Sequence, residues 1–214
     1  MKRKILSLIL INLFFISAYS QTFNPPIPVE WVIGNNRTSF QVGLNRNIYK
    51  QINFSNITSA TADYKNTPTE TELVMNNTVA YQFHKNLNIG AGLQYHYKRG
   101  LVPNISMTYT FISPAFIILI SPAFQLLPNG EKNLEFISFA EFKPKLTEKI
   151  RLYTKAQYMY NHSFTFDAHD RSFAYFRLGL KINIISFGGA CNLDYYGKDK
   201  FFKENYGGFI KFDI

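Results

Sequence analysis

Apolar and polar positions alternate along most of this chain, and the alternation predicts β-strands rather than helices. In the final segment, the even-numbered residues from Tyr206 to Ile214 share one face, while Phe209, Lys211 and Asp213 share the other. Ten such segments can be recognised, each close to the 9–11 residues of a tilted membrane strand. They cover residues 37–45, 75–84, 87–98, 103–112, 115–126, 133–143, 150–160, 172–183, 186–196 and 205–214.

The segments between these strands alternate in length. Short turns at 85–86, 113–114, 144–149 and 184–185 alternate with longer polar connections at 46–74, 98–102, 127–132, 161–171 and 197–204. Short turns on one rim and long loops on the other are typical of an up-and-down transmembrane β-barrel. The predicted fold is therefore an all-β antiparallel barrel of ten strands, with eight or twelve left open. With odd-numbered strands running outward, loops 46–74 and 161–171 should lie outside the cell.

Aromatic residues sort by height when the ten strands are aligned in this way. Tyrosines gather near the outer ends, at Tyr95, Tyr158 and Tyr206, and phenylalanines such as Phe111 and Phe187 near the other ends. Aliphatic residues lie between them. Amphipathic rings prefer the membrane interface, so two aromatic girdles around an aliphatic band indicate lipid contact.

Pro122 lies inside the predicted strand 115–126, where its missing N–H removes a ladder hydrogen bond. A bulge or a bent wall is expected at this position.

The N-terminus reads as an export signal. A basic start at residues 1–4 precedes an apolar run, and Ala18 and Ser20 supply small residues before a cut that leaves Gln21 first. The expected division is a signal peptide at 1–20, a periplasmic lead-in at 21–36 and the barrel at 37–214.

The net charge of the exported protein is lower than that of the whole sequence. The signal contains three of the 23 basic residues and none of the 14 acidic ones, so its removal lowers the formal net charge from +9 to +6. Nucleic acid is a poor partner for an exported protein, whereas anionic lipid or small anions fit this charge.

These features resemble the small outer-membrane β-barrels of Gram-negative bacteria. The resemblance covers most of residues 37–214 and the signal, and it implies location in the outer membrane and insertion by the barrel-assembly machinery. It also implies that the last strand is the insertion signal, carried here by Tyr206, Ile210, Phe212 and Ile214. The usual final residue in that superfamily is Phe, where this chain has Ile214.

Charged residues on the lumen face form the candidate site. By parity they are Glu135, Glu141, Arg151, Lys155, Arg177, Lys181, Asp194, Lys211 and Asp213. The expected register places Glu141 close to Arg151, and Lys155 near Arg177. Since buried charge must be compensated, Glu135 and Asp194 could complete a network that plugs the barrel. Alternatively, the excess of cations lines a narrow passage for anions. Ten strands leave little free cross-section, which favours the plug.

The predicted function is therefore a structural, binding or narrow anion-channel role without catalysis, in a monomeric protein whose partners are membrane lipid and the assembly machinery. No cofactor and no metal site is expected. The alternative is an outer-membrane hydrolase, of protease or lipid A deacylase type, that uses loop 161–171. For the protease type, Asp167, His169 and Asp170 would supply the Asp–His pair, but no matching acidic pair is found on the facing strands. For the deacylase type, His162 and Ser163 are adjacent, which points them to opposite faces of a strand.

Overall fold

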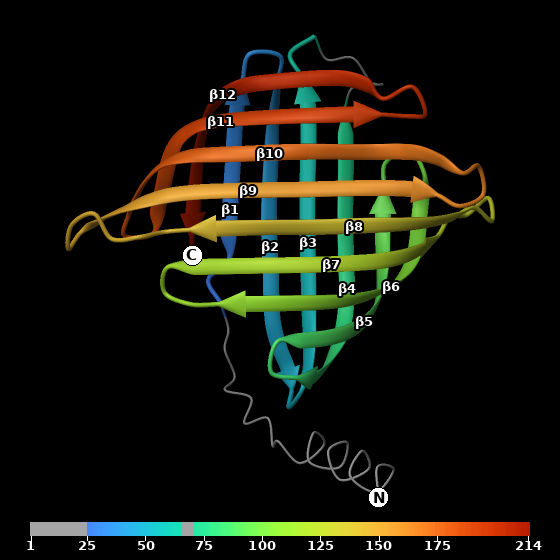
Figure 1. Cartoon of the computed structure of the whole chain (residues 1–214), viewed down its shortest axis with the longest axis horizontal. Helices are drawn as coiled ribbons and strands as arrows, with labels where there is room; N and C mark the ends of the chain where they lie inside the picture. The colour runs from blue at the N-terminus through green and yellow to red at the C-terminus, as the bar shows by residue number, and fades with distance from the viewer. Residues whose placement is uncertain (1–24, 66–70) are drawn as a thin grey trace, which may run out of the picture.

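The computed structural model describes residues 25–65 and 71–214, which form one closed antiparallel barrel of twelve strands (Figure 1). Each strand pairs with its neighbours in the sequence, and β1 pairs with β12 to close the barrel. No helix in these two ranges is long and apolar enough to cross a bilayer. The strands are β1 (Pro28–Gly34), β2 (Arg37–Tyr49), β3 (Ile52–Asp63), β4 (Glu72–His84), β5 (Leu87–His96), β6 (Gly100–Ile112), β7 (Phe116–Leu126), β8 (Lys132–Phe142), β9 (Ile150–Ser163), β10 (Ala168–Ile182), β11 (Ile185–Tyr196) and β12 (Phe201–Asp213).

The all-β antiparallel barrel predicted from the sequence is confirmed, but the preferred number of ten strands is wrong. All ten predicted segments are strands, and β1 and β3 are additional. β1 lies inside the predicted lead-in 21–36, so the barrel begins before residue 37. Its seven residues pair with β12 from Pro28↔Asp213 to Gly34↔Gly207. The predicted signal peptide and its cleavage site at Ser20 and Gln21 lie outside the described residues.

The second missed strand, β3, occupies most of the predicted outer loop 46–74. The chain turns at Lys50, whose φ of 47° is left-handed, and then runs back along β2 from Ile52 to Asp63. As a consequence, β2 runs opposite to the outward direction expected for segment 37–45. The expectation that the whole of 46–74 lies at the loop rim is wrong. At that rim β3 ends at Asp63 and β4 begins at Glu72, and residues 66–70 lie outside the described ranges.

The barrel has two unlike rims. The loop rim holds the β1–β2, β3–β4, β5–β6, β7–β8, β9–β10 and β11–β12 connections. The terminal rim holds the other five connections together with the start of β1 and the end of the chain. At this rim, Ile27 N donates to Ile214 O at 2.6 Å and Ile214 N donates to Ile27 O at 3.0 Å, which ties the chain end into the closing seam.

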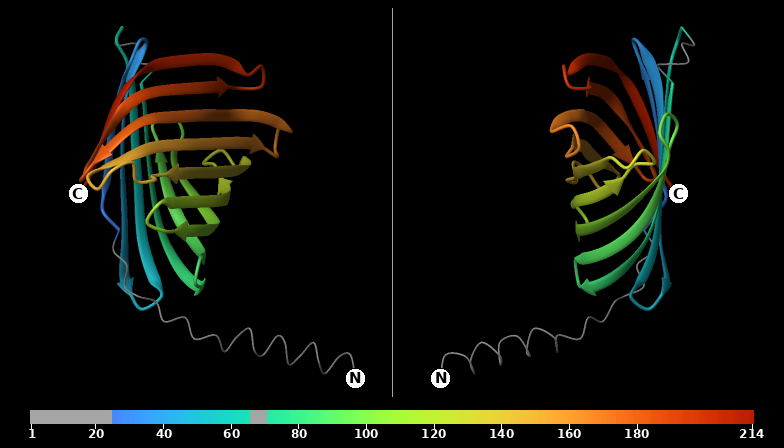
Figure 2. Two further views of the ribbon diagram at one scale, coloured as in Figure 1. Left: turned by 60° about the vertical axis from the view of Figure 1, so that its left-hand side comes forward. Right: turned by 90° about the vertical axis from the view of Figure 1, so that its right-hand side faces the viewer.

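The strands are strongly tilted, so the wall of β1–β4 and the wall of β7–β11 cross in projection (Figure 1), and Figure 2 shows them as opposite sides of the barrel. Side chains alternate between the outer face and the lumen. The outer face is mainly apolar, with Trp31 51% exposed, Ile105 62% and Leu178 63%, although Asn56, Thr58 and Asn77 make it polar over part of β3 and β4. Exposed tyrosines such as Tyr95 and Tyr206 lie toward the loop rim, and exposed phenylalanines such as Phe83 lie at the terminal rim.

Pro122 interrupts a ladder without causing the predicted bulge. Between β6 and β7 the paired positions run from Asn104↔Gln125 to Ser106↔Ala123 and resume in the same register at Tyr109↔Ile120. On its other side, β7 pairs with β8 without a break, including Pro122↔Phe136. The Thr108 and Ser121 hydroxyls, 2.8 Å apart, share a hydrogen bond where the ladder is missing. Of the two outcomes expected at this position, the bulge is therefore wrong, since the register is the same on both sides of Pro122.

Candidate functional site

The lumen contains a band of ion pairs in the part of the barrel nearer the terminal rim, which we term the central cluster. It consists of Glu30, Glu141, Lys143, Tyr153, Lys155, Arg177, Lys181, Lys211 and Asp213. These residues come from β1, from β8 to β10 and from β12, with Lys143 immediately after β8. Inward-facing positions of neighbouring strands bring them to similar heights, since Glu30 is the Cα partner of Lys211 and Glu141 that of Lys155.

Glu30 is the first centre of this cluster and is almost fully buried. Its Oε1 accepts a hydrogen bond from Nε of Arg177 at 3.1 Å and forms an ion pair with Nη2 of the same residue at 3.0 Å. Its Oε2 lies 3.5 Å from Nζ of Lys155. Arg177 also donates to Asn192 Oδ1 at 2.7 Å, and Lys155 donates to Gln41 Oε1 on β2 at 3.4 Å. These contacts cross the lumen, since Lys155 on β9 and Gln41 on β2 belong to opposite walls.

Glu141 is the second centre. Lys211 Nζ donates to its Oε1 at 2.7 Å, the Tyr153 hydroxyl donates to the same oxygen at 3.0 Å, and Lys143 Nζ donates to Oε2 at 2.9 Å. Lys211 also lies 3.4 Å from Asp213, which pairs with Lys181. Tyr153 is completely buried and packs its ring on Phe209. The two belong to a small apolar core with Val32 and Ala190, so the central cluster lies beside this core.

A second group lies closer to the loop rim, centred on Asp194, and we call it the loop-rim cluster. Asp194 is fully buried and accepts from Arg37 at 2.5 Å, from Arg171 at 3.1 Å and from the Tyr175 hydroxyl at 2.8 Å. Arg171 also pairs with Glu72 at 2.7 Å. Two arginines therefore share two carboxylates, and the group as a whole is formally neutral.

The opposite wall of the lumen, formed by β2 to β6, carries few charged side chains. Inward positions of β2 to β6 are mainly small and neutral, including Ser39, Gly43, Ser55, Ser59, Thr61, Asn76, Thr78, Gly90, Gly92, Ser106 and Thr108. Ile57 points inward with them, because it pairs with Gly43, yet it remains 39% exposed. An inward side chain with that exposure requires open space beside β3. The interior is thus charged and filled on one side, and open beside β3 on the other.

Most of the predicted lumen residues meet in the central cluster: Glu141, Lys155, Arg177, Lys181, Lys211 and Asp213. Arg151 does not contact Glu141 as predicted. Its guanidinium donates to the carbonyls of Pro114 at 3.0 Å and Lys143 at 3.4 Å, because Glu141 pairs with Lys155 in the actual register.

Glu135 and Asp194 do not complete the central cluster, contrary to expectation. Glu135 is buried among amides, where its carboxylate accepts from Asn161 Nδ2 at 3.4 Å, and Asp194 holds the loop-rim cluster. Glu30 supplies the compensating charge instead. A sequence signal for it exists, since Val29, Trp31 and Ile33 alternate with Glu30 and Val32, but the stretch is short and follows prolines.

The Asp–His pair expected for the alternative hydrolase is not formed by His169 and Asp170. A register shift between His169 and Arg171 makes Asp170 the extra residue of a β-bulge. The Asp170 carboxylate binds Arg99 at 2.5 Å and Asn133 at 3.2 Å on the lumen side. Within residues 25–65 and 71–214, no three His, Cys, Asp or Glu side chains gather in a way that could hold a metal ion.

No protein-family model and no curated protein matches the sequence. Among solved structures, the chain is similar to the NanC porin, with a TM-score of 0.53 and 10% identity over 89% of this chain and 100% of that one. The KdgM porin matches with a TM-score of 0.49 and 6% identity over 88% and 98% of the two chains. An outer membrane channel from Pseudomonas putida F1 matches with a TM-score of 0.46 and 8% identity over 92% and 97%. At this identity, the likeness to the NanC porin shows a shared barrel fold.

Proposed function

We propose that the protein is an outer-membrane β-barrel that forms a narrow water-filled passage with a preference for small anions. The mainly apolar outer face supports the membrane location, because a soluble barrel has no reason to expose so many large apolar residues, such as Trp31, Ile105 and Leu178. The aromatic residues near both rims support the same placement. With the start of β1 and the end of β12 on the short-turn rim, the loop rim faces the outside of the cell.

The passage is supported by the unlike walls of the lumen. Ten strands would leave little free cross-section and would favour a plug. The twelve strands of this barrel enclose a wider interior, because barrel diameter grows roughly linearly with strand number. The exposed inward face of Ile57 is the observation that carries the proposal. It indicates that the space beside the neutral wall remains open after the central cluster has filled the opposite side.

The anion preference follows from the composition of the central cluster. Five cations, Lys143, Lys155, Arg177, Lys181 and Lys211, face three carboxylates, Glu30, Glu141 and Asp213, which leaves a formal charge of +2. A cationic constriction of a narrow pore attracts anions and repels cations. The ion pairs tie the long cationic side chains to carboxylates on β1, β8 and β12, and the bridge that Lys155 forms across the lumen ends at Gln41 on β2, short of β3.

Planar-bilayer recordings of the Arg177→Glu variant test this role. The change takes the formal charge of the central cluster from +2 to zero, so anion selectivity should fall or reverse while conductance persists. The matched control is Lys149→Glu, an equal change of charge on an exposed turn at the terminal rim, which should leave selectivity unchanged. If Arg177→Glu does not fold, Lys155→Gln should give a smaller shift in the same direction. Equal selectivity in the wild type and in a folded cluster variant would refute the proposal.

A further inference from the structure

The outer face of the barrel carries a serine–histidine pair close to the loop rim. His169 Nε2 lies 3.0 Å from the hydroxyl oxygen of Ser172, both on β10. The bulge at Asp170 brings them together, since without the extra residue positions three apart would face opposite sides of the strand. Outward orientation follows from the pairing of Ser172 with Tyr160 and Tyr195, whose neighbours Asn161 and Asp194 point into the lumen.

The hydrogen bonds of His169 set its tautomer. Its Nδ1 lies 2.7 Å from the carbonyl oxygen of Gly197, which can only accept, so Nδ1 carries the proton. In the neutral ring, Nε2 is then an acceptor and takes a hydrogen bond from the Ser172 hydroxyl. The ring is further held by Tyr160, at 5.5 Å between ring centres, and His169 is 8% exposed. A hydroxyl nucleophile, a neighbouring base and a third group that orients the base form the arrangement used in acyl transfer.

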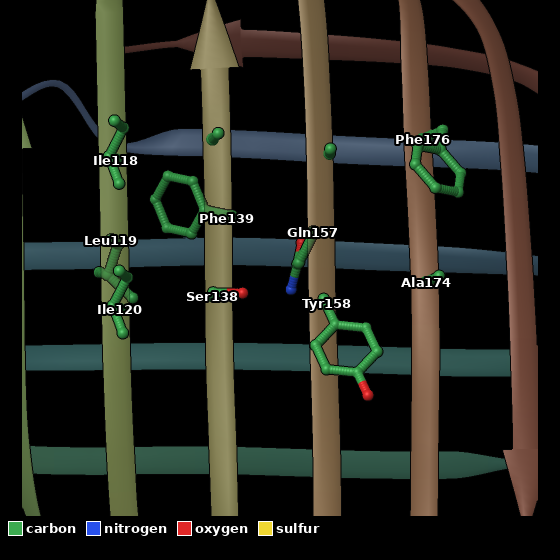
Figure 3. Close-up of a pocket in the computed structure, with 11 residues that line it drawn as sticks. Ile118, Leu119, Ile120, Ser138, Phe139, Gln157, Tyr158, Ala174 and Phe176 are labelled. Carbon is green, nitrogen blue, oxygen red and sulfur yellow. The ribbon is translucent and has the colours of Figure 1, made fainter.

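An apolar groove lies directly below this pair on the same outer wall. It has a volume of about 350 Å³, and its floor consists of the small residues Ser138, Ala140, Ala156 and Ala174. Ile120 on β7 and Phe176 on β10 form its two sides, as Figure 3 shows. Ala174 is the next outward residue after Ser172, roughly 7 Å along the strand. The groove therefore begins one outward position from the hydroxyl and extends toward the middle of the barrel wall.

We propose that Ser172 and His169 form a catalytic pair that hydrolyses a fatty-acyl ester of a lipid in the outer leaflet, with the acyl chain in this groove. The substrate class rests on the membrane placement proposed above. Ser172 lies level with Tyr160 and Tyr195, in the aromatic girdle, and interfacial residues of this kind sit at headgroup depth. Ester groups of membrane lipids lie near this depth and their chains point inward, as the groove does.

The reaction uses water as the only co-reactant. The Ser172 oxygen attacks the ester carbonyl carbon, while His169 Nε2 takes the hydroxyl proton and passes it to the departing alcohol as the ester C–O bond breaks. The acyl group is then bound to Ser172. A water molecule, deprotonated by His169, attacks that carbonyl, and the fatty acid leaves as the Ser172 oxygen regains its proton.

A long-chain alkyl fluorophosphonate, which reacts with activated serines, tests the pair on the full folded chain in detergent. Mass spectrometry should find the adduct on Ser172, and Ser172→Ala should abolish it. His169→Ala should slow labelling by about 100-fold or more, as expected for loss of a general base. Ala156→Phe, which fills the groove floor, should slow the long-chain probe but not an ethyl analogue. Ser59→Ala, an inward serine on β3, is the control and should label at the wild-type rate, and heat-modifiable migration confirms folding of each variant.

Fatty-acid release from phosphatidylethanolamine vesicles and from lipopolysaccharide distinguishes the lipid source. Release from either substrate that requires Ser172 supports the proposal and identifies the source. Labelling that is independent of His169, or release from neither lipid, overturns it. Neither readout depends on ion conduction, so a barrel that does not conduct but has a reactive Ser172 would refute only the proposed passage.

Discussion

A single methyl group on Gly207 should prevent closure of the barrel. Gly207 lies opposite Gly34 in the seam between β12 and β1. A Cβ atom built on Gly207 would lie 2.0 Å from the carbonyl oxygen of Ile33 and 2.6 Å from the Cα of Gly34, whereas ordinary contact begins near 3.4 Å. Both obstacles are backbone atoms, so no rotamer change relieves the clash. Gly208 is the matched control, because its Cβ would meet only the carbonyl oxygen of Gly188, at 3.6 Å.

The size of the effect follows from the movement that Gly207→Ala imposes. β1 would have to retreat by about 1.4 Å, which breaks the ladder at this pair and leaves about two buried backbone groups without partners. At about 1–3 kcal/mol each, the free energy of unfolding should fall by roughly 2–6 kcal/mol. Urea titration of the protein folded in lipid vesicles measures this value, and loss of heat-modifiable migration reports a failed seam. Equal stability of the Gly207→Ala and Gly208→Ala variants would refute the close approach at the seam.

Three further changes test the cluster, the outer face and the orientation. Glu30→Gln should lower the free energy of unfolding by about 3 kcal/mol, since it leaves Arg177 and Lys155 without their carboxylate, while the exposed Glu148→Gln should change it by less than about 0.5 kcal/mol in the same urea titration. Phe212→Asp should abolish insertion into vesicles, because it places a charge on the outer face of the closing strand, and normal insertion would mean that this face does not meet lipid. An epitope tag at Asp167 should bind antibody on intact cells and one at Thr147 should not; the reverse pattern would invert the orientation.

The two strands that sequence patterns miss are missed for different reasons. Ile52 and Phe54 begin the outward face of β3, but the remaining outward positions are Asn56, Thr58, Ala60 and Ala62, so most of the segment reads as a polar loop. Only the pairing of β3 with β2 and β4 places these residues in the wall. β1 does alternate, at Val29, Trp31 and Ile33, but seven residues after a proline-rich stretch are too few to distinguish a strand from an extended lead-in.

For the candidate sites, the sequence predicts which charged residues face the lumen but not which residues contact one another. Away from the bulge at Asp170, period-two parity from β8 to β12 is enough to assign inward charges such as Lys155, Arg177 and Lys211. Their actual partners depend on contacts across the lumen, which a sequence pattern does not contain. Glu30 is not predicted because its strand, β1, is not recognised. The pairing of His169 with Ser172 could not be predicted because it depends on a bulge, and a bulge reverses the parity on which the face assignment rests.

The zero-current potential of the wild-type protein in a planar bilayer tests the central claim most directly. Steady small currents are expected under a roughly tenfold gradient of potassium chloride. The zero-current potential should have the sign expected for a pore that is more permeable to chloride than to potassium, because the +2 central cluster lines the passage. Lowering the salt should strengthen the preference, because screening of the cluster weakens. A zero-current potential that indicates higher permeability to potassium than to chloride would contradict the account, and so would a folded barrel that passes no current.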